Sequence, residues 1–337
     1  MELYAGIDLH SNNCVIVVLD ANDREVYRKR LPNDLAGIIA ALRGCGEVTA
    51  VAVESTYNWY WLVNGLQGAG YEVRLVNTVA VKQYDGLKYS GDFSDAHHLA
   101  HLMRLGILPT GYIYPREDRA LRDLLRKRMQ LVRQRTTQIL SIQNLLARNL
   151  GKSLSGNVLK HWQAENIEAL PLLPEQKLAL ASNLVVMHCL DEQIALLERS
   201  ILKRTSVKPE FLALKSVSGI GDVLAPTITL ETGDITRFDG PGNFASYARA
   251  VDSRRESNGK KKGEGNSKCG NKYLAWAFVE AANFAVRYDA QIKHWYQKKT
   301  AKTMPVVAIK AVAHKLARAC YHILKTGEAF DVKRAFG

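Results

Sequence analysis

Four acidic residues in the first hundred positions have the type and spacing for metal-dependent chemistry on phosphates. Asp8 and Glu54 each follow an apolar run typical of a strand, and Asp92 and Asp95 lie three residues apart at the predicted start of a helix. Residues three apart share one helix face. Carboxylate oxygens are hard ligands that suit Mg²⁺ or Mn²⁺, and two such ions are the usual clamp for phosphoryl transfer. We therefore predict that the four carboxylates form one metal site.

Each of these acids also has an ordinary structural explanation. A single Asp after a strand is usually a turn residue, and Glu54 stands where it could cap a helix. Asp92 could be the N-cap of its helix, with Asp95 favoured in the first turn by the helix dipole. Their joint placement on strand ends and one helix start favours the metal site.

A second candidate region is the polar stretch 251–272, in which seven basic residues against three acidic ones give a net charge of +4. Four glycines let its backbone approach a phosphate closely. A solvated flexible loop explains the composition equally well. The basic residues are Arg254, Arg255, Lys260, Lys261, Lys262, Lys268 and Lys272.

Two shorter signals have similar alternatives. Gly219 and Gly221 lie in a Ser-Gly-Ile-Gly turn before an apolar stretch, which is similar to the hairpin of helix–hairpin–helix modules and would expose N–H groups to a phosphate. An ordinary turn between helices fits equally. His97, His98 and His101 have the spacing of a soft-ion site, but a surface or groove position is favoured because the carboxylates already supply ligands.

The charge balance points to a polyanionic partner. Of 337 residues, 46 are Lys or Arg and 33 are Asp or Glu, a net charge of +13. This excess favours nucleic acid over an anionic membrane, with a merely basic enzyme as the alternative. The five scattered cysteines argue against a disulfide framework or a structural zinc. Without a long apolar run or a signal peptide, the expectation is a soluble cytoplasmic protein without a membrane partner.

The order of predicted elements indicates three domains. Residues 1–110 alternate strands and helices as an α/β domain: three strands in a meander, then helix, strand, helix, strand, helix. Residues 111–205 form a helical, coiled-coil arm, whose first helix spans 116–150 and whose second spans 178–203. Residues 206–337 are mostly helical.

The first arm helix is strongly basic. Residues 116–152 hold ten Lys or Arg and three acidic residues, a net charge of +7. An apolar stripe is expected to pack on a partner helix while Arg119, Arg126 and Arg133 face nucleic acid. A helix of 35 residues is about 50 Å long at 1.5 Å per residue. That length predicts that the arm separates the C-terminal domain from its own carboxylates, with the alternative that the second long helix folds back and restores contact within one chain.

Several of these motifs together resemble one family. The segments GIDLHSNN, VVLD, AVES, GLKYSGDFSDAHHLA, SVSGIG and RRESNGKKKGEGNSKCGNKYL are similar, in this order, to the insertion sequence 110 family of transposases, the DEDD recombinases related to the Piv invertase. The similarity covers almost the whole chain. One departure is Ser55 in Glu54-Ser55-Thr56, where the family usually has alanine.

The resemblance implies a RuvC-like, RNase H-like N-terminal domain. It implies that Asp8, Glu54, Asp92 and Asp95 are the catalytic metal ligands, for Mg²⁺ or Mn²⁺. It also implies that a serine attacks the scissile phosphate, and the family motif falls on Ser257. By chemistry alone Ser253 and Ser267 are rivals. A serine hydroxyl needs a base or a metal, and no histidine lies in this stretch.

The activity implied is transposition, by cutting and rejoining donor and target DNA with a transient phosphoserine link. A noncoding guide RNA from the same element would pair with both DNAs, while the protein binds the sugar–phosphate backbones. The protein would be associated with the nucleoid when it acts. The long helices would form a homodimer, and two dimers a tetramer, with carboxylates and serine from different subunits. Two alternatives are a RuvC-like nuclease, which would not need Ser257, and a non-catalytic nucleic-acid-binding scaffold.

Overall fold

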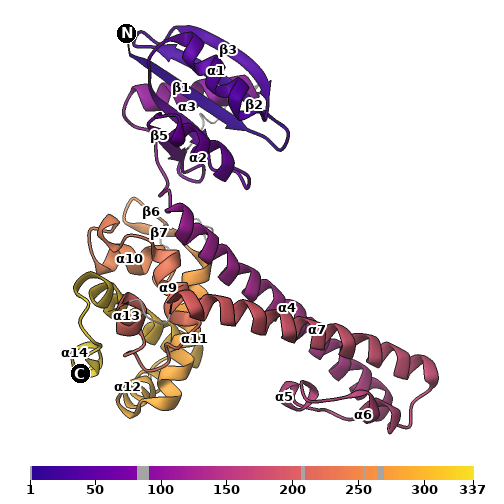
Figure 1. The fold of residues 1–337 in the computed structure, drawn as a ribbon. Coiled ribbons are helices and arrows are strands. Elements are labelled where there is room, and N and C mark those ends of the chain that lie inside the picture. Colours follow the sequence, from indigo (N-terminus) through magenta and orange to yellow (C-terminus); the bar gives the residue numbers. More distant parts are fainter. Residues whose placement is uncertain (1, 82–90, 206–208, 253–254, 264–268) are drawn as a thin grey trace. The chain divides into compact units, whose positions relative to one another are not determined.

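The computed structural model describes residues 2–81, 91–205, 209–252, 255–263 and 269–337 (Figure 1). The chain divides into two compact units, residues 1–113 and 114–337. The first is a sheet with helices on both faces, and the second is mostly helical. This mixed α/β start followed by a mainly helical remainder agrees with the sequence prediction.

The N-terminal unit is a five-stranded sheet in the order β3-β2-β1-β4-β5. Strands β1, β2 and β3 are antiparallel neighbours, whereas β4 and β5 run parallel to β1. The predicted order of strands and helices is confirmed. The elements are β1 (Leu3–Leu9), β2 (Asn13–Asp20), β3 (Glu25–Pro32), α1 (Leu35–Cys45), β4 (Val48–Glu54), α2 (Tyr60–Gly68), β5 (Val73–Val76) and α3 (Asp92–Arg104).

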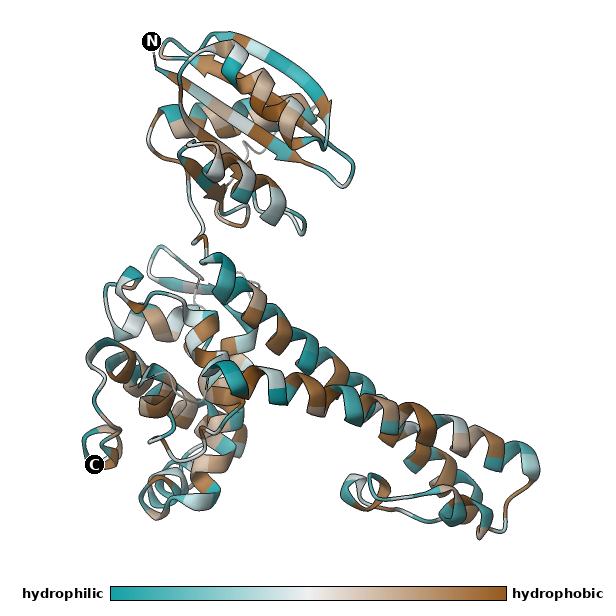
Figure 2. Cartoon of the chain, in the orientation of Figure 1, coloured by the Kyte–Doolittle hydropathy of each residue, from teal (hydrophilic) through white to brown (hydrophobic). Residues whose placement is uncertain are grey.

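Both faces of this sheet are covered, which explains why its central strands are almost continuously apolar. One face packs on α1 and α2, through residues such as Ile7, Ile38 and Leu62. The other packs on α3, where Val15 and Val17 meet alanines of that helix. Figure 2 shows the apolar central strands beside the hydrophilic edge strand β3. The charged side chains of β3 suit an edge that must not pair with another sheet.

Helix α3 approaches β1 unusually closely at Gly6. A Cβ atom on Gly6 would lie 2.0 Å from the carbonyl oxygen of Ala96 and 2.8 Å from the nitrogen of Ala100. Both obstacles are backbone atoms, so no side chain could move aside. The small residues on both elements therefore set the depth at which α3 rests on the sheet.

The C-terminal unit begins with two long helices. Its elements are α4 (Arg116–Leu150), α5 (Gly156–Leu159), α6 (Ala164–Glu168), α7 (Pro174–Thr205), α8 (Pro209–Leu214), α9 (Leu224–Thr232), the 3₁₀ turn η1 (Ile235–Arg237), α10 (Pro241–Tyr247), β6 (Arg255–Ser257), β7 (Lys260–Gly263), α11 (Lys272–Tyr288), α12 (Ala290–Thr300), α13 (Pro305–Thr326) and α14 (Val332–Phe336). The bounds of α4 are those predicted.

Helices α4 and α7 pair as the antiparallel arm that the sequence predicts (Figure 1). Apolar residues such as Ile142, Leu146 and Leu184 pack between them, and Arg128 pairs with Glu198. Because α7 returns along α4, the C-terminal helices pack beside the first turns of α4. The second arm helix therefore folds back along the first, and the separation of the C-terminal domain from its own carboxylates stays a prediction.

Within the described residues, α7 is also long and apolar enough to cross a membrane by length and composition alone. Only part of its surface is covered by the pairing. Leu178 and Val185 are both 69% exposed, and Leu196 is 51% exposed. Since spacings of 7 and 11 residues return to nearly the same side of a helix, these three side chains form one outward stripe.

A buried ion pair joins α4 to the C-terminal helices. Glu231 in α9 is 1% exposed, and its two carboxylate oxygens accept hydrogen bonds of 2.6 and 2.7 Å from the Arg126 guanidinium. The Asn271 amide donates to the same carboxylate at 2.7 Å, and the Tyr114 hydroxyl donates to the Glu231 carbonyl at 2.8 Å. Three other segments of the chain thus converge on one residue, Glu231.

The close approach at Gly6 yields a first prediction. Replacing Gly6 with alanine must displace α3, and overpacking of this kind costs about 1–3 kcal/mol. We expect urea unfolding to show a loss of that size. Gly44→Ala is the control, because Gly44 lies in α1 with nothing near its would-be Cβ, where alanine stabilises a helix by up to about 1 kcal/mol. Equal stability of the two variants would contradict the role given to Gly6.

Candidate active site

Asp8 and Glu54 lie side by side because their strands are parallel neighbours. Ile7 pairs with Val53, so the residue that follows each is at the same edge of the sheet. Asp8 is 4% exposed, and Glu54 is half-buried. The carboxyl ends of parallel strands thereby bring together two acids separated by 46 positions in the sequence.

The surroundings of Glu54 disfavour its ionised form. Burial raises the pKa of Glu54 to about 8, with further contributions from the hydrogen bond and negative charge of Asp8 and from the charge of Asp95. Burial and like charges both raise the pKa of a carboxyl group. The sheet edge therefore concentrates negative charge that a bound cation would neutralise.

Asp92 and Asp95 both lie in the first turn of α3. The N-cap is Gly91, so the alternative in which Asp92 caps the helix is wrong. The Ser94 hydroxyl closes this turn by accepting from the Gly91 N–H and donating to the Gly91 carbonyl. Because α3 rests so closely on the sheet, its first turn reaches the edge where Asp8 and Glu54 lie. The structure thus brings the four predicted acids together.

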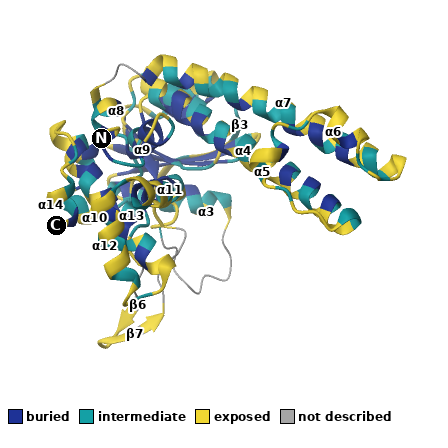
Figure 3. Ribbon diagram, turned by 90° about the horizontal axis from the view of Figure 1, so that it is seen from below, coloured by how far each residue is buried: buried dark blue, intermediate teal, exposed yellow. Residues whose placement is uncertain are grey.

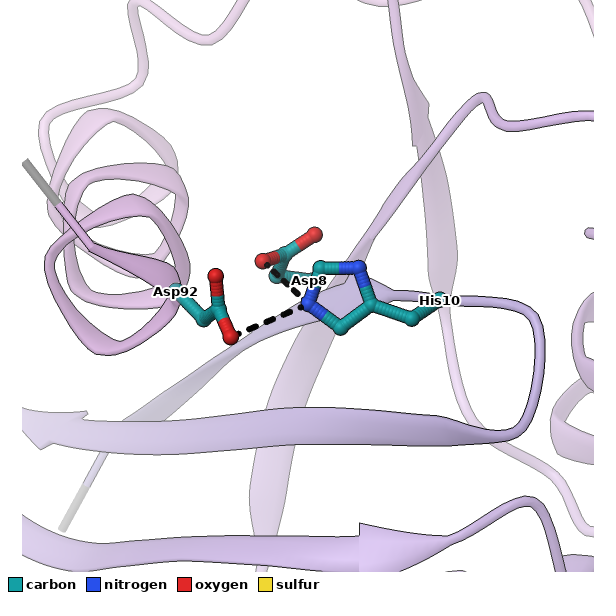
Figure 4. Close-up of side chains that lie close together, drawn as sticks. All are labelled: Asp8, His10 and Asp92. Carbon is teal, nitrogen blue, oxygen red and sulfur yellow. Dashed lines mark ion pairs between the residues drawn. The ribbon is translucent and has the colours of Figure 1, made fainter.

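Two residues that sequence analysis missed, His10 and Arg30, complete the cluster. His10 Nε2 lies 3.3 Å from Asp8 Oδ2 and 3.3 Å from Asp92 Oδ2 (Figure 4). Arg30 of β3 forms an ion pair with Asp92, and it lowers the pKa of that carboxyl group, with a smaller contribution from His10. The signal available was the i, i+2 spacing of Asp8 and His10 at a strand end, which places both on one side.

The donor set fits a divalent cation. One ligand atom each of Asp8, His10 and Asp92 lies within 4.8 Å of the others. Asp8 is hydrogen-bonded to Glu54, and Glu54 feels the charge of Asp95. Hard oxygen donors in excess of nearby positive charge are what Mg²⁺ and Mn²⁺ require.

The three histidines of α3 are engaged elsewhere or outside the cluster. His101 Nδ1 lies 2.8 Å from Asp23, which also accepts a hydrogen bond from Arg104. His97 is 3.9 Å from Glu25. In the described ranges, the grouping of potential metal ligands contains none of the α3 histidines. This agrees with a surface or groove position for them.

Ser257 lies on a β-hairpin, whereas the sequence was interpreted as a polar loop. It pairs with Lys260 across a turn formed by Asn258 and Gly259, both with positive φ. An Asn-Gly pair is the strongest short-range hairpin signal, because both turn residues must adopt the left-handed region. Figure 3 shows β6 and β7 in the colour of exposed residues, and Ser257, which directly precedes the turn, is exposed. Arg254, Lys268 and the rival serines Ser253 and Ser267 lie outside the described residues.

The two ends of the segment that carries this hairpin are held together. The Arg249 side chain donates to the carbonyls of Cys269 and Gly270, and the Asn271 N–H donates to the Tyr247 carbonyl at 2.6 Å. Asn271 also caps α11 and binds Glu231. The hairpin therefore projects from a rigid base. Lys260 and Lys262 are exposed; for Arg255 and Lys261 only the backbone is described, and Lys272 begins α11.

The arm arginines do not all face outward. Arg119 is 3% exposed and is part of the interior, so the prediction that it faces nucleic acid is wrong. Arg126 pairs with Glu231, but its side chain is 32% exposed and lines the same groove as Arg133, so its contact with nucleic acid stays a prediction. Arg133 is exposed, and it lines a groove of about 500 Å³ beside Lys127 and Tyr273.

Gly219 is required by packing. It has a φ of +96°, and a Cβ there would lie 2.5 Å from the carbonyl oxygen of Ala281 in α11. Gly221 has open space around it. The turn before α9 thus has a structural reason for its first glycine, and contact of either glycine with a phosphate remains a prediction.

Comparison with known proteins assigns this combination of an acidic sheet edge and a helical C-terminal unit to the DNA transposases. Residues 5–149, which include all four acids, match a family described as transposase, of the DEDD type. Residues 212–297, which include Ser257, match the transposase IS116/IS110/IS902 family.

The chain belongs to the IS110 family of transposases and is a DNA transposase enzyme. It is 23% identical over 334 residues to the transposase of IS1328 from Yersinia enterocolitica, covering 97% of this chain and 98% of that protein. A Sinorhizobium fredii protein assigned as a transposase, y4qE, is 24% identical over 328 residues, 94% and 81% of the two chains. The transposase of IS1111A from Coxiella burnetii is 23% identical over 301 residues, 88% and 80%. The family's DEDD type points to use of a divalent metal.

The raised pKa of Glu54 predicts a pH-dependent gain in stability for Glu54→Gln in EDTA. An unfolded glutamate ionises near pH 4.5, whereas Glu54 in the folded chain ionises near 8. Folding of the wild type therefore takes up a proton between these values, and its stability falls as pH rises through them. Glutamine cannot ionise, so its advantage should be absent below about pH 4.5, grow to about 1–2 kcal/mol by pH 8 after solvent screening, and then level off.

Thermal melts from pH 4 to 9 measure this difference, with exposed Glu47→Gln as the control. Addition of Mn²⁺ should make the wild type more stable than Glu54→Gln, because only the wild type keeps the full ligand set. A Glu54→Gln advantage that is the same at every pH would contradict the assignment.

Proposed function

We propose that this transposase cuts and rejoins DNA strands of an insertion sequence with a metal site at the sheet edge and Ser257 as nucleophile. Asp8, Glu54, Asp92 and Asp95 would hold Mg²⁺ or Mn²⁺. The carrying observation is the geometry of the sheet edge: Asp8 and Glu54 end neighbouring parallel strands, and ligand atoms of Asp8 and Asp92 lie within 4.8 Å of each other. The sheet order, with three antiparallel strands followed by two parallel ones, supports an RNase H-like, RuvC-like fold.

The proposed reaction conserves the energy of the phosphodiester. The Ser257 hydroxyl oxygen attacks phosphorus and forms a phosphoserine ester, while the bond from phosphorus to the leaving oxygen breaks and that oxygen takes up a proton. A strand hydroxyl then attacks the ester, which restores the serine and joins the strands. Bound divalent cations would supply charge neutralisation for the pentavalent phosphate.

The hairpin suits this role for Ser257. Its exposed tip can reach a DNA backbone, and the neighbouring Lys260 and Lys262 can pair with phosphates. A serine hydroxyl is a weak nucleophile that needs activation. No histidine occurs in residues 251–272, so activation falls to the carboxylate site, which must meet the hairpin on the DNA.

The groove beside α4 is the proposed place for a nucleic-acid backbone. Arg133 and Lys127 line it, and the Tyr273 ring is stacked on the Arg126 guanidinium 4.4 Å from its centroid. With a net charge of +13, the protein holds backbones, while an element-encoded guide RNA would read donor and target DNA by base pairing. The residues 1–110, 111–205 and 206–337 would act as catalytic domain, arm and serine-bearing domain.

We propose that the outward stripe of α7, formed by Leu178, Val185 and Leu196, pairs with a second copy. Exposed apolar rows of this kind are typical of helix–helix interfaces. Such a pairing would give a homodimer, and two dimers would assemble on the two DNA duplexes of a recombination reaction.

The first test is a covalent-trapping assay with labelled DNA and Mg²⁺ or Mn²⁺. Ser257→Ala should lose the protein–DNA adduct and strand exchange by at least about 10³-fold, because the attacking oxygen is gone, and should keep DNA binding. Ser253→Ala and Ser267→Ala are the matched controls and should retain the adduct. Cleavage that persists without Ser257 would support the nuclease alternative, and binding without any cleavage by the wild type would support the scaffold.

The second test concerns the arm. Val185→Glu combined with Leu196→Glu should lower the mass in light scattering by about half, since two charges would be buried at the α7 interface. Val79→Glu, at a valine of the N-terminal unit that is 50% exposed, should leave the mass unchanged. Unchanged assembly of the double variant would place the interface elsewhere.

A further inference from the structure

His10 lies among the acidic side chains at the sheet edge, and it is not one of the residues that the sequence predicted for the metal site. Its Nε2 atom is 3.3 Å from an oxygen of Asp8 and 3.3 Å from an oxygen of Asp92. Figure 4 shows one imidazole nitrogen facing both carboxylates, at the point where the chain leaves β1. The three donor atoms are close enough for one small cation to reach them all.

The backbone of His10 is fixed by three segments. The Asn33 side chain donates to the His10 carbonyl at 3.0 Å, and the Asn58 side chain donates to the same oxygen at 2.9 Å. The His10 N–H donates to the Asn13 carbonyl at 2.9 Å. Asn58 is itself held by Thr56, two residues after Glu54. The chain therefore positions the imidazole with the same loop that follows a catalytic acid.

The two contacts of Nε2, each 3.3 Å long, are ion pairs when the imidazole is protonated. The atom is buried, and within the described residues neither contact has the geometry of a well-formed hydrogen bond. Asp92 already has a cationic partner in Arg30. A buried nitrogen that faces two carboxylate oxygens without a well-formed hydrogen bond to either is also the arrangement expected of a metal ligand.

We propose that His10 is a metal ligand, binding a divalent cation through Nε2 together with Asp8 and Asp92. The proposal rests on the metal site of the proposed function and adds a nitrogen donor to it. Imidazole suits transition metals, whereas Mg²⁺ prefers oxygen and water. His10 therefore makes this site favour Mn²⁺ over Mg²⁺ relative to an all-carboxylate site.

The decisive measurement is pulsed electron paramagnetic resonance of Mn²⁺ bound to the full chain after EDTA treatment and dialysis. Electron spin-echo modulation should show the nitrogen of a directly bound imidazole in the wild type. His10→Ala should lose that signal and bind Mn²⁺ at least about tenfold more weakly, with a smaller loss for Mg²⁺. His101→Ala is the control and should keep both the imidazole signal and the Mn²⁺ affinity, because His101 is paired with Asp23.

The outcomes separate this proposal from the function on which it rests. Bound Mn²⁺ without imidazole modulation in the wild type would overturn the role of His10, and that result needs no variant to fold. Asp8→Asn should abolish Mn²⁺ binding. If it does so while His10→Ala binds normally, the carboxylate site stands and His10 is not a ligand. If Asp8→Asn binds as the wild type, the proposed metal site itself fails.

Discussion

The burial of carboxylates close to one another is the constraint on which the N-terminal unit depends. Asp8 and Glu54 end neighbouring parallel strands, and α3 adds two further acids at the same edge. Like charges in a partly buried setting oppose folding, so the rest of the unit must hold them in place. A fully apolar sheet core covered on both faces and the close approach of α3 at Gly6 supply that stability. Such a cost in stability is typical of functional sites.

Arginine side chains neutralise part of the negative charge at the sheet edge. Arg30 extends from the edge strand to Asp92, and its guanidinium lies 5.9 Å from the Phe93 ring centroid, beside Arg28 at 4.5 Å. The raised pKa of Glu54 shows that this balance is incomplete at the buried end of the cluster. A divalent cation would thus find its strongest attraction near Asp8 and Glu54, where no arginine of the described chain is paired.

The C-terminal unit also buries a carboxylate, that of Glu231, but pairs it with positive charge. Glu231 is almost fully buried, yet Arg126 and Asn271 satisfy its carboxylate, so the charge is paired and hydrogen-bonded. Removing one partner of such a pair leaves an uncompensated charge and is strongly destabilising. Because Asn271 also closes the base of the segment that carries Ser257, the arm helix α4 and the hairpin share one buried anchor. A movement of α4 would therefore change the contacts of Asn271 at the base of the hairpin.

The amino-acid sequence by itself determined the elements and the four acids, because strand and helix periodicity and caps are local properties. It predicted α4 to the residue, and the family resemblance placed Ser257 in its block. The hairpin at Asn258-Gly259 was also readable from local turn chemistry, although it was interpreted as a loop. The burial of Arg119 and the pairing of Arg126 with Glu231 could not be predicted, since a basic helix gives no sign of which arginines will meet distant parts of the chain. The place of His10 and Arg30 at the site was likewise decided by tertiary structure, because strand pairing and the depth of α3 determine which side chains meet at the sheet edge.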